Sequence, residues 1–413
     1  MAEMKDSGIE WIGMIPKNWN ADKIKYHLKR NEPKNPGNVE VLSVYREYGV
    51  IPKNSRDDNH NITSEDTSKY KYVKKGDLVI NKMKAWQGSM GVSEYEGIVS
   101  PAYFIYNFTD NYLDKKYFHF LIRNCYKDEF RRISGGIREG QWDLSADLFA
   151  DELVLVPPIK EQIKIVEFLN TKCAEIDTLY SDIEKQIDTL EEYKKTTITE
   201  AVTKGLDPDV EMKNSGIEWI GEIPQKWECK KVKYSCKTRN EKYDITHGRL
   251  NYFALENLVS WNMKYIETEN EYDVSGTNLC YKNDVVFGKL RPYLAKTFLV
   301  DYDRCCSTEF AVFHSFQGLP KYYLYVFTTQ GFVKTVDDST LGVKMPRANI
   351  EFIKNVFIPV APKSEQQQIV DYLDSKCTEI DGIIFEKKKQ LETLEQYKKS
   401  LIYEYVTGKK EVK

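Results

Sequence analysis

Basic and aromatic side chains alternate in four glycine-bordered segments of the chain. The first half contains NKMKAWQG and RRISGGIREGQW, and the second half contains GKLRPY and GVKMPR. Lysine, arginine and glutamine on loops can donate hydrogen bonds to base edges and to phosphates. The pattern therefore predicts a DNA contact. The candidate residues are Lys82, Lys84, Trp86, Gln87, Arg131, Arg138, Gln141, Lys289, Arg291, Tyr293, Lys344 and Arg347.

The alternative for any one of these residues is an ordinary solvated loop charge. Recurrence of the segments at matching places in the two halves favours a shared binding role. The whole chain has a net charge of −3, and its acid excess falls mainly in residues 161–204. Binding to nucleic acid would therefore depend on local basic faces, because the overall field does not attract a polyanion.

Catalytic signatures are absent from the sequence. There is no G-x-x-x-x-G-K-[ST] nucleotide loop and no N-P-P-[FY] segment, and the five histidines lack the spacing of metal ligands. The string PDVEMK resembles fragments of a nuclease carboxylate motif, but its elements are contiguous and lie in a linker. We therefore expect a non-catalytic chain that itself binds no cofactor and no metal.

The segments that must position the basic loops occur twice. SGIEWIG begins at Ser7 and again at Ser215, and each copy is followed by Ile-Pro and a Trp. A second pair, EQIKIVEFLNTKCAEID and EQQQIVDYLDSKCTEID, begins at Glu161 and Glu365. Internal repeats of this kind indicate one module written twice. The intervening residues 20–155 and 228–359 differ, which favours two different recognition surfaces on one scaffold over a duplication whose inserts drifted.

Each second block begins a long amphipathic helix. Apolar residues recur at steps of three and four, from Val166 to Leu190 and from Val370 to Tyr405. This heptad pattern predicts a coiled coil, with two separately packed helices as the alternative. We expect the first helix to end at Gly205 and Pro208 and the second at Gly408, and Ser364 to begin the second as a cap.

The lengths of these helices predict how they pair. A helix of roughly 44 residues is roughly 65 Å long, whereas a domain of about 160 residues is about 40 Å across. The second insert is too small to connect two parallel helices, so we expect them to be antiparallel. A globular domain would then lie at each end of a rod, and the first repeat block would lie near the end of the second helix.

The inserts mix short strands with helices, and this combination predicts α+β or α/β domains. Strand patterns include DLVIN and YFIYNF in the first insert and DVVFGKL and EFAVFHSF in the second. Helices are predicted over residues 115–132 and 321–336. The sequence contains no apolar run of about 18 residues, so no membrane span is predicted. The eight cysteines include no C-x-x-C pair, so a reducing cytoplasm is expected.

The repeated SGIEWIG-x-IP-x-x-W blocks, the P-x-x-x-EQ-x-x-I-V helix openings, the duplicated long helices and the paired variable inserts resemble the specificity subunit of type I restriction–modification enzymes. The resemblance covers the whole chain. It implies a non-catalytic subunit that reads a bipartite DNA target. It also implies two modification subunits, which methylate adenine with S-adenosylmethionine, and two restriction subunits, which need ATP and Mg; the holoenzyme is an endonuclease and methyltransferase.

The resemblance assigns the parts of the chain as follows. Residues 1–159 form the first target recognition domain with its repeat block at 5–19, and residues 160–206 form the first conserved helix. Residues 207–363 form the second recognition domain with its block at 213–227, and residues 364–413 form the second helix. The rival hypothesis is a two-headed coiled-coil scaffold that binds proteins. Divergent inserts with Lys, Arg, Gln and Trp on loops favour DNA recognition.

Overall fold

The computed structural model describes residues 3–37, 39–46, 48–55, 66–136, 142–244, 250–267, 274, 276–340 and 344–412. They form two compact units. Unit 1 comprises Met1–Ile183 with Lys389–Lys413, and unit 2 comprises Glu184–Lys388. Two long helices, α4 (Ile159–Lys204) and α9 (Lys363–Val406), contribute residues to both units.

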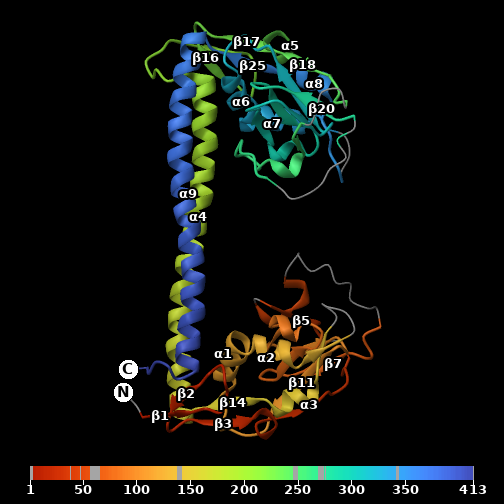
Figure 1. Ribbon diagram of the computed structural model, residues 1–413, viewed down its shortest axis with the longest axis vertical. Helices are drawn as coiled ribbons and strands as arrows, with labels where there is room; N and C mark the ends of the chain where they lie inside the picture. The colour runs from red at the N-terminus through yellow and green to blue at the C-terminus, as the bar shows by residue number, and fades with distance from the viewer. Residues whose placement is uncertain are drawn as a thin grey trace. The chain divides into compact units, whose positions relative to one another are not determined.

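Within each unit, α4 and α9 lie side by side and run antiparallel (Figure 1). In unit 1 the Lys398 ammonium contacts the Asp177 carboxylate at 2.6 Å, and in unit 2 Lys194 contacts Asp381 at the same distance. The apolar seam predicted from the heptads is buried or half-buried in both units, which confirms the coiled-coil pattern. Its buried members include Val166, Leu169, Cys173, Ile176, Ile187, Val370, Leu373, Cys377, Ile380, Ile384 and Leu401.

Both helices end before a glycine, as predicted. Gly205 and Gly408 follow α4 and α9 with φ angles of 76° and 71°, in the left-handed region that glycine adopts without steric cost. The predicted cap at Ser364 is wrong, because α9 begins one residue earlier, at Lys363. No helix in the described part of the chain is long and apolar enough to cross a membrane.

The first globular part is built around an antiparallel four-stranded sheet with the order β4-β11-β8-β9. Helices α1 and α2 follow β11, so the single helix predicted over 115–132 is in fact two, which meet at Tyr126. The elements are β1 (Met4–Asp6), β2 (Met14–Pro16), β3 (Asn20–Lys23), β4 (Leu28–Arg30), β5 (Leu42–Tyr45), β6 (Gly49–Pro52), β7 (Lys71–Val73), β8 (Leu78–Asn81), β9 (Met90–Val92), β10 (Gly97–Val99), β11 (Tyr103–Phe108), α1 (Lys115–Cys125), α2 (Lys127–Arg132), β12 (Ser134–Gly135), β13 (Asp143–Leu144), α3 (Ala146–Asp151) and β14 (Leu153–Val156).

The second globular part repeats this topology, with the sheet order β18-β24-β21-β22. The helix predicted over 321–336 is again two helices, which meet at Thr329. The elements are β15 (Met212–Asn214), β16 (Glu222–Pro224), β17 (Glu228–Lys231), α5 (Val232–Ser235), β18 (Lys237–Arg239), β19 (Tyr252–Phe253), β20 (Asn278–Cys280), β21 (Val285–Gly288), β22 (Thr297–Leu299), β23 (Arg304–Cys306), β24 (Phe310–His314), α6 (Pro320–Thr328), α7 (Gln330–Asp337), α8 (Ile350–Asn355) and β25 (Phe357–Val360).

The repeated sequence blocks meet at the ends of the helices. In unit 1 the Trp19 indole donates to the Glu161 carboxylate at 2.7 Å, and Lys409, just after α9, donates to the Met14 carbonyl at 2.6 Å. In unit 2 the Trp227 indole donates to Glu365 at 2.7 Å. The end of α9 in unit 1 therefore packs against a repeat block, and in unit 2 Trp227 of the other repeat block packs against Gly205 at the end of α4. The predicted position of the first repeat block near the end of the second helix is thereby confirmed within unit 1.

Candidate nucleic-acid interface

One predicted basic segment of each half lies on the same hairpin connection in both globular parts. The first basic loop (residues 82–88, with the 3-10 helix η3, Ala85–Gln87) joins β8 to β9, and the second basic loop (residues 289–296, with η6, Pro292–Leu294) joins β21 to β22. The Leu144 amide donates to the Lys82 carbonyl, and the Ala348 amide donates to the Lys289 carbonyl, both at 2.9 Å. Each basic loop is therefore held beside the second predicted segment of its own half.

In the first half, aromatic contacts join the two predicted segments. The rings of Trp86 and Trp142 lie 5.7 Å apart, and the Arg131 guanidinium lies 5.8 Å from the Trp142 ring. The Lys82 ammonium forms a 2.8 Å ion pair with Asp143. Lys82 is therefore neutralised by a neighbour that lies outside the predicted basic segments.

Lys84 and Gln87 occupy the rest of the first basic loop. The Lys84 side chain is exposed, and the Gln87 amide oxygen accepts a hydrogen bond from Arg46 at 2.8 Å. Arg46 follows β5 and is an exposed basic residue that the glycine-bordered segments did not reveal. The predicted contacts Arg138 and Gln141 lie outside the described residues.

In the second half, the Glu309 carboxylate pairs with Arg347, and the Lys289 amide donates to the Glu309 carbonyl at 2.8 Å. Arg347 forms an ion pair with Glu309 at 2.9 Å, and Lys289 is half-buried beside both residues. Burial, and next the charge of Arg347, lower the pKa of Lys289. Glu309 therefore positions one cation and partly offsets the repulsion between two. Glu309 lies just before β24 and outside the four basic segments, so the sequence pattern did not predict its role.

The other predicted residues of the second half are presented on the surface. Arg291 is exposed, has a φ of 52° and donates its amide to the Pro346 carbonyl at 2.8 Å. Tyr293 and Lys344 are also exposed. Arginine can bond both acceptors of a guanine edge in the major groove, whereas a flexible lysine more often meets a phosphate. The two basic loops thus share one scaffold position but offer different donor sets.

The charge at this matched position differs between the halves. Lys82 with Asp143 is balanced, whereas Lys289 and Arg347 with Glu309 leave one positive charge in excess. An arginine paired with a partly buried carboxylate is fixed in orientation and retains further N–H donors for a ligand. This difference predicts that the two halves select different sequences.

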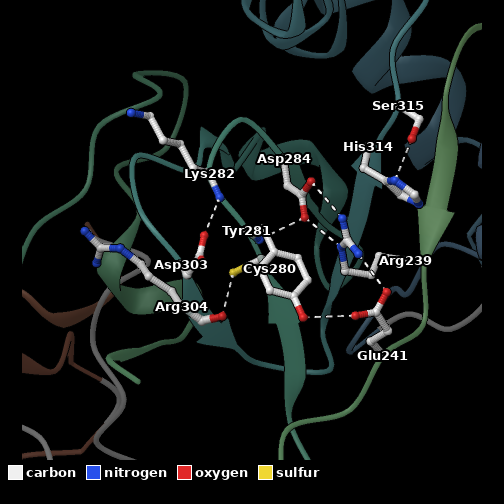
Figure 2. A network of polar contacts seen from close by, with 10 residues as sticks. All are labelled: Arg239, Glu241, Cys280, Tyr281, Lys282, Asp284, Asp303, Arg304, His314 and Ser315. Carbon is white, nitrogen blue, oxygen red and sulfur yellow. Dashed lines mark hydrogen bonds and ion pairs between the residues drawn. The ribbon is translucent and has the colours of Figure 1, made fainter. Parts of the chain in front are cut away.

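A polar network anchors the strand that carries the second basic loop (Figure 2). The Arg239 guanidinium donates to Asp284 at 2.8 Å and to Glu241 at 2.7 Å, and it lies 4.4 Å from the Tyr281 ring. The Tyr281 hydroxyl donates to Glu241 at 3.1 Å. Asp284 immediately precedes β21, so these contacts fix the start of the strand whose other end leads into the basic loop.

The first half fixes the matching strand with other partners. Asp77 precedes β8, accepts the Lys74 amide at 2.8 Å and accepts a hydrogen bond from Asn107. Burial raises the pKa of Asp77. Within the described ranges, no group of three His, Cys, Asp or Glu side chains is arranged to hold a metal ion.

Comparisons with known proteins agree with this architecture. Residues 211–396 match the family model described as the type I restriction modification DNA specificity domain. The MjaVIII type I restriction enzyme specificity subunit of Methanocaldococcus jannaschii is 24% identical and is aligned over 97% of this chain and 94% of its own length. The putative MjaX specificity subunit of the same organism is 22% identical over 97% and 96%.

Solved structures show the same fold. A chain from a structural study of complex assembly and conformational transition of the type I R-M system has a TM-score of 0.69, with 12% identity over 95% of this chain and 98% of its own. The HsdS subunit of Thermoanaerobacter tengcongensis has a TM-score of 0.52, with 13% identity over the same shares. The predicted resemblance is therefore confirmed: residues 211–396 match the type I restriction modification DNA specificity domain, and the chain is similar to type I specificity subunits along almost its whole length.

Proposed function

We propose that the chain is the DNA sequence-recognition subunit of a type I restriction–modification complex and reads a bipartite target. One observation carries this proposal: the same hairpin connection of a four-stranded sheet with the same strand order bears a basic loop in each of the two domains, with different side chains in each. A protein with a single recognition domain would need only one such loop. Two unlike loops on matched scaffolds suit two unlike half-sites, separated by bases that neither domain reads.

The proposed partners are double-stranded DNA, two modification subunits and two restriction subunits. The relatives are named as specificity subunits of restriction enzymes, which supports recognition rather than catalysis as the contribution of this chain. S-adenosylmethionine, ATP and Mg would be used by the partner subunits. Such a complex acts on genomic DNA, so we propose a cytoplasmic location.

The proposal is tested with the chain purified together with its modification subunits. In a gel-mobility assay, the complex is expected to shift a duplex that carries the target, and only DNA with that sequence should compete. The methylated adenines in a host genome should define a motif with two halves. Retardation that any duplex displaces equally would contradict sequence recognition and favour the protein-scaffold alternative. A methylome with one uninterrupted motif would contradict the bipartite reading.

A further inference from the structure

Residues 257–266 form a tight hairpin with a strained tip in unit 2. The Val259 amide donates to the Lys264 carbonyl at 3.0 Å, and the hairpin turns through Trp261 and Met263, whose φ angles are 59° and 56°. Side chains larger than glycine rarely adopt this left-handed conformation, and it persists where surrounding contacts over-determine it. The hairpin must therefore be held by strong neighbours.

Those neighbours are the two long helices. The Lys194 ammonium of α4 contacts Asp381 of α9 at 2.6 Å and Asn262 at 3.3 Å, and Lys264 contacts the other oxygen of Asp381 at 2.9 Å. The side chain of Lys194 is only 6% exposed. Because a buried charge without partners is costly, this three-residue ion network attaches the hairpin firmly to the helix pair.

The same tip also contacts the second basic loop. The Trp261 indole donates a hydrogen bond to the Tyr293 carbonyl at 3.1 Å, while the Lys195 ammonium lies 5.0 Å from the Trp261 ring. Trp261 therefore connects α4 directly with the segment that carries Arg291. An indole that stacks under a cation and donates from its edge fixes both neighbours at once.

We propose that the hairpin 257–266 is a brace that holds the second basic loop at a fixed position on the helix pair, with Trp261 as its positioning residue. This inference rests on the proposed function. The brace makes the distance between the second half-site and the helices a fixed quantity. It thereby contributes to the choice of spacer length in the target, which base contacts alone would not set.

Hydrogen exchange of the full chain without DNA tests the mechanical part. Trp261→Phe keeps the ring over Lys195 but removes the N–H donor, and exchange in the peptide that contains Leu294 and Ala295 should become about tenfold faster, the effect of one typical hydrogen bond. Trp261→Ala should exceed this effect. Lys282→Met, at an exposed lysine of the same unit, is the matched control and should change nothing. Unchanged exchange in Trp261→Ala, or equal acceleration throughout unit 2, would overturn the brace.

DNA binding by the complex with modification subunits tests the functional part. The wild-type complex should prefer its own spacer to spacers one base pair longer or shorter, and Trp261→Ala should reduce this preference about tenfold without altering base choice in the first half-site. Trp261→Phe should lie between the two. A variant complex that keeps the full spacer preference would refute the brace. A wild-type complex without any sequence preference would refute the proposed function instead. The hydrogen-exchange result for Trp261→Ala would then still decide whether the brace exists.

Discussion

Replacing Asp381 with asparagine should destabilise unit 2 more than most single substitutions in the chain. The Asp381 carboxylate accepts both Lys194 and Lys264, and its side chain is 17% exposed. Burial acts to raise the pKa of Asp381, but the hydrogen bonds from Lys194 and then Lys264 outweigh it, so the pKa is lowered overall. The carboxylate is therefore charged at neutral pH and compensates a buried ammonium.

The expected loss in the free energy of unfolding follows from the contacts that Asp381→Asn leaves to Lys194. In Asp381→Asn, Lys194 remains almost completely buried and retains Asn262 at 3.3 Å as its partner. Removing one member of a buried ion pair typically costs about 3–5 kcal/mol. The double variant Lys194→Met, Asp381→Asn removes the buried charge as well and should recover most of this loss.

Hydrogen exchange resolves the two units and is the appropriate assay. Amides in residues 184–204 and 363–388 should exchange at least about a hundredfold faster in Asp381→Asn, because each 1.4 kcal/mol is about tenfold. Lowering the pH should also destabilise unit 2 of the wild type, because protonation removes the charge of Asp381. A lowered folded-state pKa contributes stability above the unfolded value near about 4, and this stability disappears as the pH falls through the folded value. Exchange within tenfold of wild type, or a double variant no better than the single one, would refute the reasoning.

Three further predictions concern unit 1 and DNA. Burial, and next the charge of Arg123, lower the pKa of His119 to about 4, so unit 1 should lose up to about 3 kcal/mol as the pH falls from about 6.5 to about 4, and His119→Gln should abolish that loss in a pH series of hydrogen exchange. Arg347→Ala should cost about 1–3 kcal/mol of binding and relax base choice only in the second half-site, whereas Lys84→Ala should affect only the first, as measured with targets altered one base at a time. Exchanging residues 20–155 for the insert of another specificity subunit should change one half of the methylated motif; a change in both halves would contradict independent reading.

Much of the fold could be predicted because repeats and periodicity are local properties of the sequence. The three-and-four spacing of Val166, Leu169 and Cys173 identified a helix face, and burial of that face is its physical consequence. The glycines after each helix were equally readable, since few residues other than glycine adopt a positive φ. The breaks at Tyr126 and Thr329 were not, because both adjoining segments have helical patterns and only packing separates them.

The candidate site was predictable in its location but not in its pairings. The matching segments indicated that basic loops occupy one scaffold position in each half. Which cation is neutralised depends on partners distant in the chain, such as Asp143 for Lys82 and Glu309 for Arg347. Lys194 illustrates the same limit, because a lysine within an amphipathic helix looks solvent-exposed until Asp381, 187 residues away, is placed against it.

The contacts between the long helices and the inserts explain how the inserts can diverge while the repeated segments stay similar. The Gln162 side chain donates to the carbonyls of Tyr112 and Pro157 and accepts the Asp114 amide, and Gln366 likewise bonds the Ala361 carbonyl and the Leu319 amide. These are backbone groups, which every sequence provides. Gln162 and Gln366, which follow the recurring glutamates, bind the inserts through backbone groups. The side chains of the inserts are therefore not needed for these contacts and can vary. A repeated Glu-Gln pair with unlike neighbours is therefore the pattern expected of a scaffold that carries exchangeable reading domains.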